Sequence, residues 1–264
     1  MSRRLLTFPC DGHTLVGTLD GPPEGGGGAT GLLIVTGGNE IRAGAHRGMA
    51  ELAARLAADG TPVFRYDRRG VGDSSGINSG FRGARDDLLA AAATFRAAAP
   101  QVTRLIGFGN CDGATSLAWW GREAGCDALV LANPWTVEPT DALPPPAAVR
   151  AHYAVQLRDP AAWARILRRG LSLPKLARGL RSIAASPRDD GVTGRTIASI
   201  AQWGPDATIV LARGDGTAIA YADAARRAGI SPRTVTLDTG SHSFARSGDA
   251  AALEAAIRQV LSAP

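Results

Sequence analysis

The stretch with the strongest chemical signature is Gly109-Asn110-Cys111-Asp112-Gly113, which directly follows an apolar run. Its two glycines permit a strand to turn sharply into a helix, because a Cβ at either position would obstruct the neighbouring backbone. Such a turn projects the central side chain from the tip of a sheet, at a helix N-terminus that favours a thiolate. We therefore predict that Cys111 is a nucleophile, although most isolated cysteines are small buried apolar residues.

A thiol nucleophile needs a base, and the sequence holds four histidines, His13, His46, His152 and His242. His242 follows the last predicted strand of the chain. Because the loops at the carboxyl ends of parallel strands line one crevice, His242 is the histidine that we expect to reach Cys111.

The third catalytic residue should orient the imidazole and come from the end of an intervening strand. Asp215 follows the apolar run Ile209–Leu211 and is our prediction for this role. Asp238 and Glu138 also follow predicted strands and remain alternatives, and the Gly-Asp-Gly around Asp215 also suits a plain turn. The order of nucleophile, acid and histidine is that of the α/β-hydrolases.

Two backbone N–H groups should stabilise the oxyanion that forms during attack on a carbonyl. One is the N–H of Asp112, which follows the nucleophile. The other should come from the glycine-containing loop after the apolar run Gly31–Thr36, where Gly38 or Asn39 would supply it, although a simple tight turn explains the same residues. The polar, glycine-rich stretch 66–74 is predicted to be structural.

These residues must be positioned by the elements around them. Apolar runs alternate with helical patterns, which predicts an α/β-hydrolase fold with a mostly parallel, doubly wound sheet and helices on both faces. The expected strands are Arg4–Phe8, His13–Leu19, Gly31–Thr36, Pro62–Tyr66, Val102–Ile106, Asp127–Leu131, Thr208–Leu211 and Thr234–Leu237. The expected helices are Ala45–Asp59, Arg82–Ala98, Asp112–Glu123, Ala218–Arg227 and Asp249–Leu261.

Residues 134–200 interrupt this alternation with a triple proline and arginine-rich amphipathic segments. We expect them to form a helical cap over a core of residues 1–133 and 201–264. Because this insertion leaves the sheet beside the predicted nucleophile, Trp135, Tyr153 and Trp163 would line an apolar acyl pocket. The arginines would form a cationic rim or a solvated helix face.

Composition excludes several classes of function. The 264 residues carry a formal charge of +5, but no run of five or six like charges suggests a nucleic-acid partner. No apolar run is long enough to span a bilayer, and Pro9 and Asp11 interrupt the N-terminal apolar run, so we expect no signal peptide.

The three cysteines, Cys10, Cys111 and Cys126, form neither a disulfide framework nor a zinc pattern. We therefore expect a cytoplasmic protein without stable membrane insertion, and the proposed chemistry requires no metal or organic cofactor. The sequence is compatible with a homodimer.

Several motifs resemble those of one known family: the elbow Gly-Asn-Cys-Asp-Gly-Ala, the Val-Leu-Ala-Asn-Pro-Trp that closes the next strand, and Gly-Gly-Asn-Glu-Ile-Arg-Ala-Gly-Ala-His-Arg after the third strand. They resemble the α/β-hydrolases associated with exosortase A systems, specifically the type 1 hydrolase. The resemblance implies a bacterial hydrolase encoded among exopolysaccharide and PEP-CTERM protein-sorting functions. Glu40 departs from the family's pattern.

The predicted reaction is acyl transfer from an ester or thioester, with a small-molecule or carrier-linked acyl substrate and an acyl-enzyme on Cys111. An acyltransferase is the first alternative, because amines and thiols also intercept a thioester intermediate. A catalytically silent binding protein with the same fold is the second. A dinucleotide site at Gly107–Gly113 is disfavoured, because Asp127 lies at the wrong end of the following strand.

Overall fold

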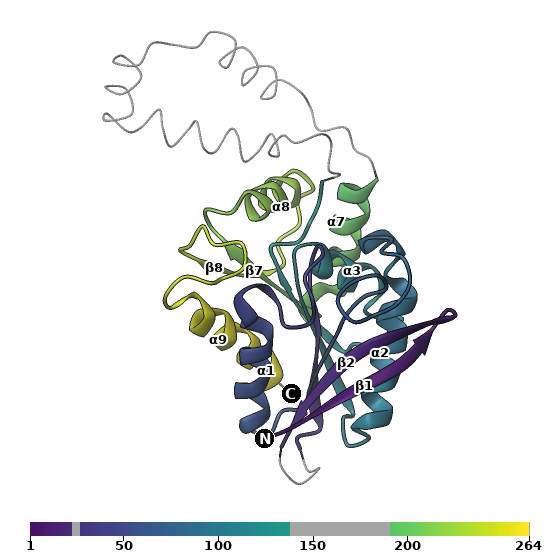
Figure 1. Ribbon diagram of the computed structural model, residues 1–264. Helices are drawn as coiled ribbons and strands as arrows, with labels where there is room; N and C mark the ends of the chain where they lie inside the picture. Colours follow the sequence, from purple (N-terminus) through teal and green to yellow (C-terminus); the bar gives the residue numbers. More distant parts are fainter. Residues whose placement is uncertain (23–26, 138–190, 264) are drawn as a thin grey trace, which may run out of the picture.

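The computed structural model describes residues 1–22, 27–137 and 191–263, which contain one eight-stranded sheet (Figure 1). The strands follow the order β1-β2-β4-β3-β5-β6-β7-β8. β4, β3 and β5 to β8 are parallel, and β1 and β2 form an antiparallel hairpin at one edge. The strands are β1 (Ser2–Cys10), β2 (His13–Gly21), β3 (Thr30–Val35), β4 (Val63–Tyr66), β5 (Arg104–Asn110), β6 (Ala128–Ala132), β7 (Ala207–Ala212) and β8 (Arg233–Leu237).

Helices cover both faces of the sheet. Alternation along β3 shows why, since Leu32 and Ile34 belong to one core and Leu33 and Val35 to the other. The first core includes α1 (Gly48–Ala58) and α9 (Asp249–Leu261); the second includes α2 (Arg85–Ala98), α3 (Asp112–Trp120), α7 (Val192–Trp203) and α8 (Gly216–Arg227). This three-layer arrangement confirms the predicted α/β fold class.

Several predicted elements have different bounds in the structure, and two of them lie next to the predicted site. The helix expected from residue 45 begins only at Gly48, because His46 and Arg47 have φ angles of 52° and 63°, which an α-helix does not accept. The strand that was expected to end at Ile106 continues to Asn110. Within this extension Gly107 packs closely against neighbouring side chains, since a Cβ there would lie 2.8 Å from those of both Leu117 and Leu129.

Helix α7 begins within the predicted insertion and packs against α3. Ile197, Ile200 and Trp203 are buried, and the Trp203 indole Nε1 donates a hydrogen bond to the carbonyl of Ala118 (3.1 Å). Residues 138–190 of the predicted insertion, including Tyr153, Trp163 and the alternatives His152 and Glu138, lie outside the described residues. Within the described ranges, no helix combines the length and apolar character needed to cross a bilayer.

Candidate active site

Cys111 lies at the sharp turn between β5 and α3, at the centre of the sheet's carboxyl edge. Its φ and ψ angles of 59° and −127° are rare for a residue with a side chain, and such strain is common at functional sites. Its N–H donates to the carbonyl of Ala132 (3.0 Å), and its own carbonyl accepts from Trp135 N–H (3.2 Å). A Cβ on Gly109 would lie 2.6 Å from the carbonyl carbon of Gly113. The predicted strand–turn–helix geometry is therefore present.

His242 and Asp215 meet beside this turn. The Nδ1 of His242 lies 3.0 Å from Asp215 Oδ1. The hydrogen bond to Asp215, and next the one to the Cys111 thiol, raise the pKa of His242 to about 10. Burial favours the neutral form of Asp215, but His242 and the N–H groups of Thr217 and Ala218 outweigh it and lower the pKa of that carboxyl. An imidazolium next to a sulfur is thus the favoured state at neutral pH.

The rival acids do not share this position. Asp238 is almost fully exposed, and its carboxylate lies 3.5 Å from the guanidinium of Arg213. Glu138 falls outside the described residues. Asp215 is the acid whose distance to His242 fits the orienting role.

Two asparagines that the sequence did not single out as site residues hold the backbone of His242. The side-chain amides of Asn110 and Asn133 donate to the carbonyl of His242 at 3.1 and 3.2 Å. The Oδ1 of Asn133 in turn accepts from the N–H of Ala212 (2.9 Å). Asn110 ends β5, Asn133 directly follows β6 and Ala212 ends β7, so three strand ends fix the histidine loop. The position of both asparagines at strand ends was the available signal.

We expect Asn133→Asp to lower kcat/KM for an activated ester by about tenfold to a hundredfold, the size of two lost hydrogen bonds of about 1–1.5 kcal/mol each. The aspartate still accepts from Ala212 N–H and tolerates the φ of 42° at this position, but it cannot donate to the carbonyl of His242 or to Asn110 Oδ1. Parallel thermal unfolding separates this effect from a loss of fold. An unchanged rate would show that His242 is positioned without this contact.

The loop after β3 packs against the turn. A Cβ on Gly37 would lie 2.5 Å from the carbonyl oxygen of Asn110. The N–H of Gly38 donates to Asp112 Oδ1 (2.6 Å), so this predicted oxyanion donor is already occupied by a carboxylate. The N–H groups of Asn39 and Asp112 donate to no acceptor among the residues that the structure describes.

Arg68 supports the same loop from beneath. Its Nη2 donates to the carbonyl of Gly38 and lies 3.6 Å from Asp112 Oδ1. The Arg68 side chain is only 3% exposed. Its Nε and Nη1 have no hydrogen-bond partner within the described part of the chain. Sequence reasoning regarded the stretch around Arg68 as purely structural.

The rest of that stretch is structural, as expected. The Ser74 hydroxyl donates to the carbonyl of Asp67 (2.7 Å), and the N–H of Asp73 donates to the Asp67 carboxylate (3.0 Å). Glu40 is half-buried in the same loop, and burial raises the pKa of its carboxyl. The charge of Asp112 adds to this rise, whereas the N–H of Ala45 and the charge of His242 oppose it.

Cys111 differs from the other two cysteines. Cys10 and Cys126 are buried, whereas Cys111 is partly exposed. Burial, reinforced at Cys10 by Asp87, raises the pKa of the Cys10 thiol to about 11, and burial raises that of Cys126 to about 12. Both of these thiols are therefore protonated at neutral pH.

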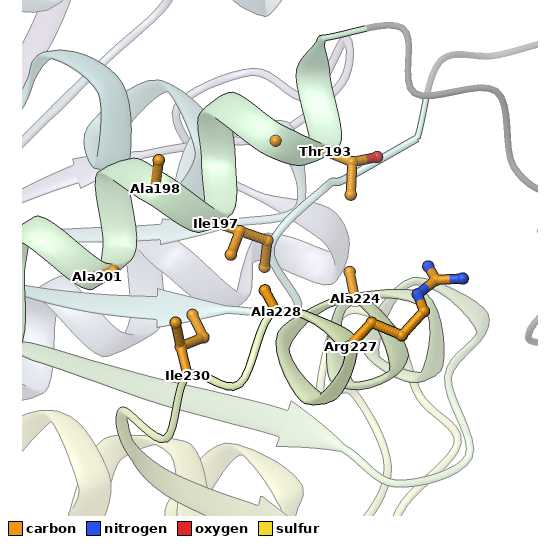
Figure 2. A pocket seen from close by; sticks show the side chains of 9 residues that line it. Thr193, Ile197, Ala198, Ala201, Ala224, Arg227, Ala228 and Ile230 are labelled. Carbon is orange, nitrogen blue, oxygen red and sulfur yellow. The ribbon is translucent and has the colours of Figure 1, made fainter.

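An apolar groove of about 530 Å³ lies elsewhere, between α7 and α8 (Figure 2). The α7 side chains of Thr193, Ile197, Ala198 and Ala201 face Ala224 and Arg227 of α8. No residue of the proposed triad lines this groove, so it is distinct from the candidate active site.

Comparison with known proteins agrees with the fold. The sequence pattern of the family described as serine aminopeptidase, S33 matches residues 32–211. None of the curated proteins matches the chain significantly.

Several solved structures share the fold over nearly the whole chain. An α/β serine hydrolase without lid from Xanthomonas campestris has a TM-score of 0.60 at 17% identity, covering 100% of this chain and 97% of its own. An esterase from Pyrococcus furiosus has a TM-score of 0.62 at 14% identity, with 98% and 89% covered. An α/β hydrolase from Sphaerobacter thermophilus has a TM-score of 0.56 at 24% identity, with 96% and 100% covered. These likenesses establish the α/β-hydrolase fold.

Proposed function

This chain belongs to the serine aminopeptidase S33 family, and we propose that it is a hydrolase that cleaves esters or thioesters through an acyl-enzyme on Cys111. The observation that carries the proposal is the 3.0 Å contact between His242 Nδ1 and Asp215 Oδ1 beside the strained turn at Cys111. Nucleophile, histidine and acid then have the spatial roles of a triad, with cysteine in place of serine.

The reaction begins when His242, whose raised pKa makes it a strong proton acceptor, takes the thiol proton of Cys111. The sulfur of Cys111 attacks the carbonyl carbon, a C–S bond forms, and the π electrons of the carbonyl move to its oxygen. When the carbonyl re-forms, the bond to the leaving group breaks and the imidazolium donates its proton to that group. Water then gives a proton to His242 and attacks the thioester, which releases the acid and regenerates the thiolate.

The oxyanion would be stabilised by the N–H of Asp112 and by a second N–H from Gly38 or Asn39. Trp135, whose N–H contacts the carbonyl of Cys111, is proposed to border the acyl group. Tyr153 and Trp163 are proposed as further substrate contacts from the predicted cap.

The motif resemblance supports a finer assignment within this family. The chain is proposed to be a hydrolase of exosortase A systems that acts in the cytoplasm on an acyl compound linked to exopolysaccharide or protein sorting. An acyltransferase remains the alternative, since the same thioester can pass its acyl group to an amine or thiol.

Intact-mass spectrometry after rapid mixing with p-nitrophenyl butyrate and with a butyryl thioester tests the proposed function. We expect one butyryl adduct, which peptide mapping places on Cys111, and its decay at the rate of product release. Absence of the adduct, with iodoacetamide labelling Cys111 no faster than Cys10 and Cys126, would favour a catalytically silent protein. Faster decay with an added amine would identify transfer.

Stability should depend on pH through His242. An unfolded histidine titrates near 6.5, whereas the folded pKa is about 10, so the contribution of its pairing is fully present below pH 6.5. Between these values the folded state retains a proton that the unfolded state releases, and the contribution declines as the pH rises to about 10. The lowered pKa of Asp215 means that acid removes the pairing only below the ordinary value of 3.8.

We therefore expect the difference in free energy of unfolding between wild type and His242→Gln to be largest at pH 5–6. It should shrink steadily towards pH 10, as measured by urea denaturation at each pH. A difference that stays constant over this interval would contradict the raised pKa of His242.

A further inference from the structure

The N–H of Gly38 is positioned beside the nucleophile but is bound by a carboxylate of the protein itself. Asp112 Oδ1 accepts from Gly38 N–H at 2.6 Å, and Asp112 directly follows Cys111 in the chain. An N–H that binds a carboxylate cannot at the same time stabilise an oxyanion. With Asp112 in this position Gly38 cannot serve as an oxyanion donor, and of the two predicted loop donors Asn39 N–H is the one left without an acceptor among the described residues.

The structure also holds a second partner for this carboxylate. The Arg68 guanidinium lies 3.6 Å from Asp112 Oδ1 through Nη2, which donates to the carbonyl of Gly38. Arg68 is 97% buried, with its side chain 3% exposed, and its Nε and Nη1 have no hydrogen-bond partner within the described ranges. Buried guanidinium N–H groups without an acceptor are costly, and a planar guanidinium suits a bidentate carboxylate.

We propose that Asp112 is a positioning residue with two sites, Gly38 N–H and the Arg68 guanidinium, and that Gly38 N–H speeds acylation as an oxyanion donor only after the carboxylate has moved from the first site to the second. The inference rests on the proposed function, since it concerns the oxyanion of the same reaction. In the closed arrangement Asp112 occupies the Gly38 donor. In the open arrangement the carboxylate leaves Gly38 and binds the Arg68 guanidinium alone, so that Gly38 N–H is free for the oxyanion.

The two arrangements explain three features together. The 15% exposure of the Asp112 side chain leaves it room to move, whereas Arg68 is fixed by burial and by its contact with Gly38. The same guanidinium contacts the loop that carries the donor, so the loop stays in place while the carboxylate moves. Fast acylation with Gly38 N–H as an oxyanion donor therefore depends on Arg68.

Single-turnover acylation with p-nitrophenyl butyrate distinguishes the occupation of Gly38 N–H by the Asp112 side chain from the effect of the negative charge of Asp112. We expect Asp112→Ala to acylate about tenfold faster than wild type, because it frees the Gly38 N–H while keeping the backbone N–H of residue 112. The matched control Asp112→Asn also removes the negative charge, but its amide oxygen still accepts from Gly38 N–H. We expect its rate to be no higher than that of wild type.

Arg68 is tested by combination. We expect Arg68→Gln alone to slow acylation about tenfold, because it removes the open position of Asp112. In the double variant Arg68→Gln with Asp112→Ala, the rate should return to that of Asp112→Ala alone. A merely structural Arg68 would leave the double variant as slow as the single one, and that result overturns the inference.

The outcome also separates this inference from the proposed function. If wild type forms the butyryl adduct on Cys111 but Asp112→Ala is no faster, or Asp112→Asn is equally accelerated, the two-position role of Asp112 is wrong and the triad stands. If no variant forms the adduct, the proposed function and this inference both fail.

Discussion

Cys111→Ala should lower the rate of hydrolysis of activated esters by a factor on the order of 10⁵ to 10⁶, as expected when a nucleophile is removed from a triad. The substitution deletes only a sulfur atom at a partly exposed position, so the fold and the His242–Asp215 contact should persist. Initial rates with p-nitrophenyl butyrate and the circular dichroism spectrum provide the measurement.

Two further variants make this result specific. Cys111→Ser should keep slight activity, because a neutral hydroxyl depends more strongly on the base than a thiol does. Cys10→Ala should hydrolyse the ester at the wild-type rate, because Cys10 is buried beside Asp87 and away from the proposed triad. Normal turnover by the Cys111→Ala variant would exclude covalent catalysis at this residue.

Asp215→Asn should lower kcat by about 10² to 10⁴, the range expected when a triad loses its orienting carboxylate. Without the carboxylate, the imidazolium of His242 is no longer favoured and the histidine loses its fixed tautomer. Asparagine is also a good N-cap, so its side-chain oxygen can still accept from Thr217 and Ala218 at the start of α8. The loss of rate should therefore exceed any loss of stability.

The control for this variant is Asp238→Asn. Asp238 is 88% exposed and contacts Arg213, so its substitution should leave kcat within about twofold of wild type. If Asp238→Asn were the damaging variant, the acid would be misassigned although Cys111 and His242 kept their roles. Kinetics and thermal unfolding of both variants decide between the two acids.

The sequence was sufficient for the elements whose signals are local. The turn at Cys111 depends on Gly109 and Gly113, and the strand–helix alternation places the loops of Asp215 and His242 at the same edge of the sheet. These features follow from residue types at short spacing, so the fold and the proximity of the three candidate residues could be predicted.

Hydrogen-bond partners between distant loops were not predictable in the same way. Gly38 and Asp112 are 74 positions apart, and nothing in either segment shows that the carboxylate would take this particular N–H. The amides of Asn110 and Asn133 reach His242 only because β5 and β6 pair in register, from Asn110 to Ala132. Likewise, the left-handed backbone at Arg47 has no local cause in its residue type and delays the start of α1.

Because two of the three cysteines are buried, a thiol reagent should modify the native protein at a single position. At neutral pH a maleimide dye or a disulfide exchanger such as Ellman's reagent should react with the native chain at Cys111 alone, because the thiols of Cys10 and Cys126 have raised pKa values of about 11 and 12. Full denaturation should release all three equivalents. A fluorophore, a spin label or a solid support can thus be attached at the mouth of the site without removing any native cysteine.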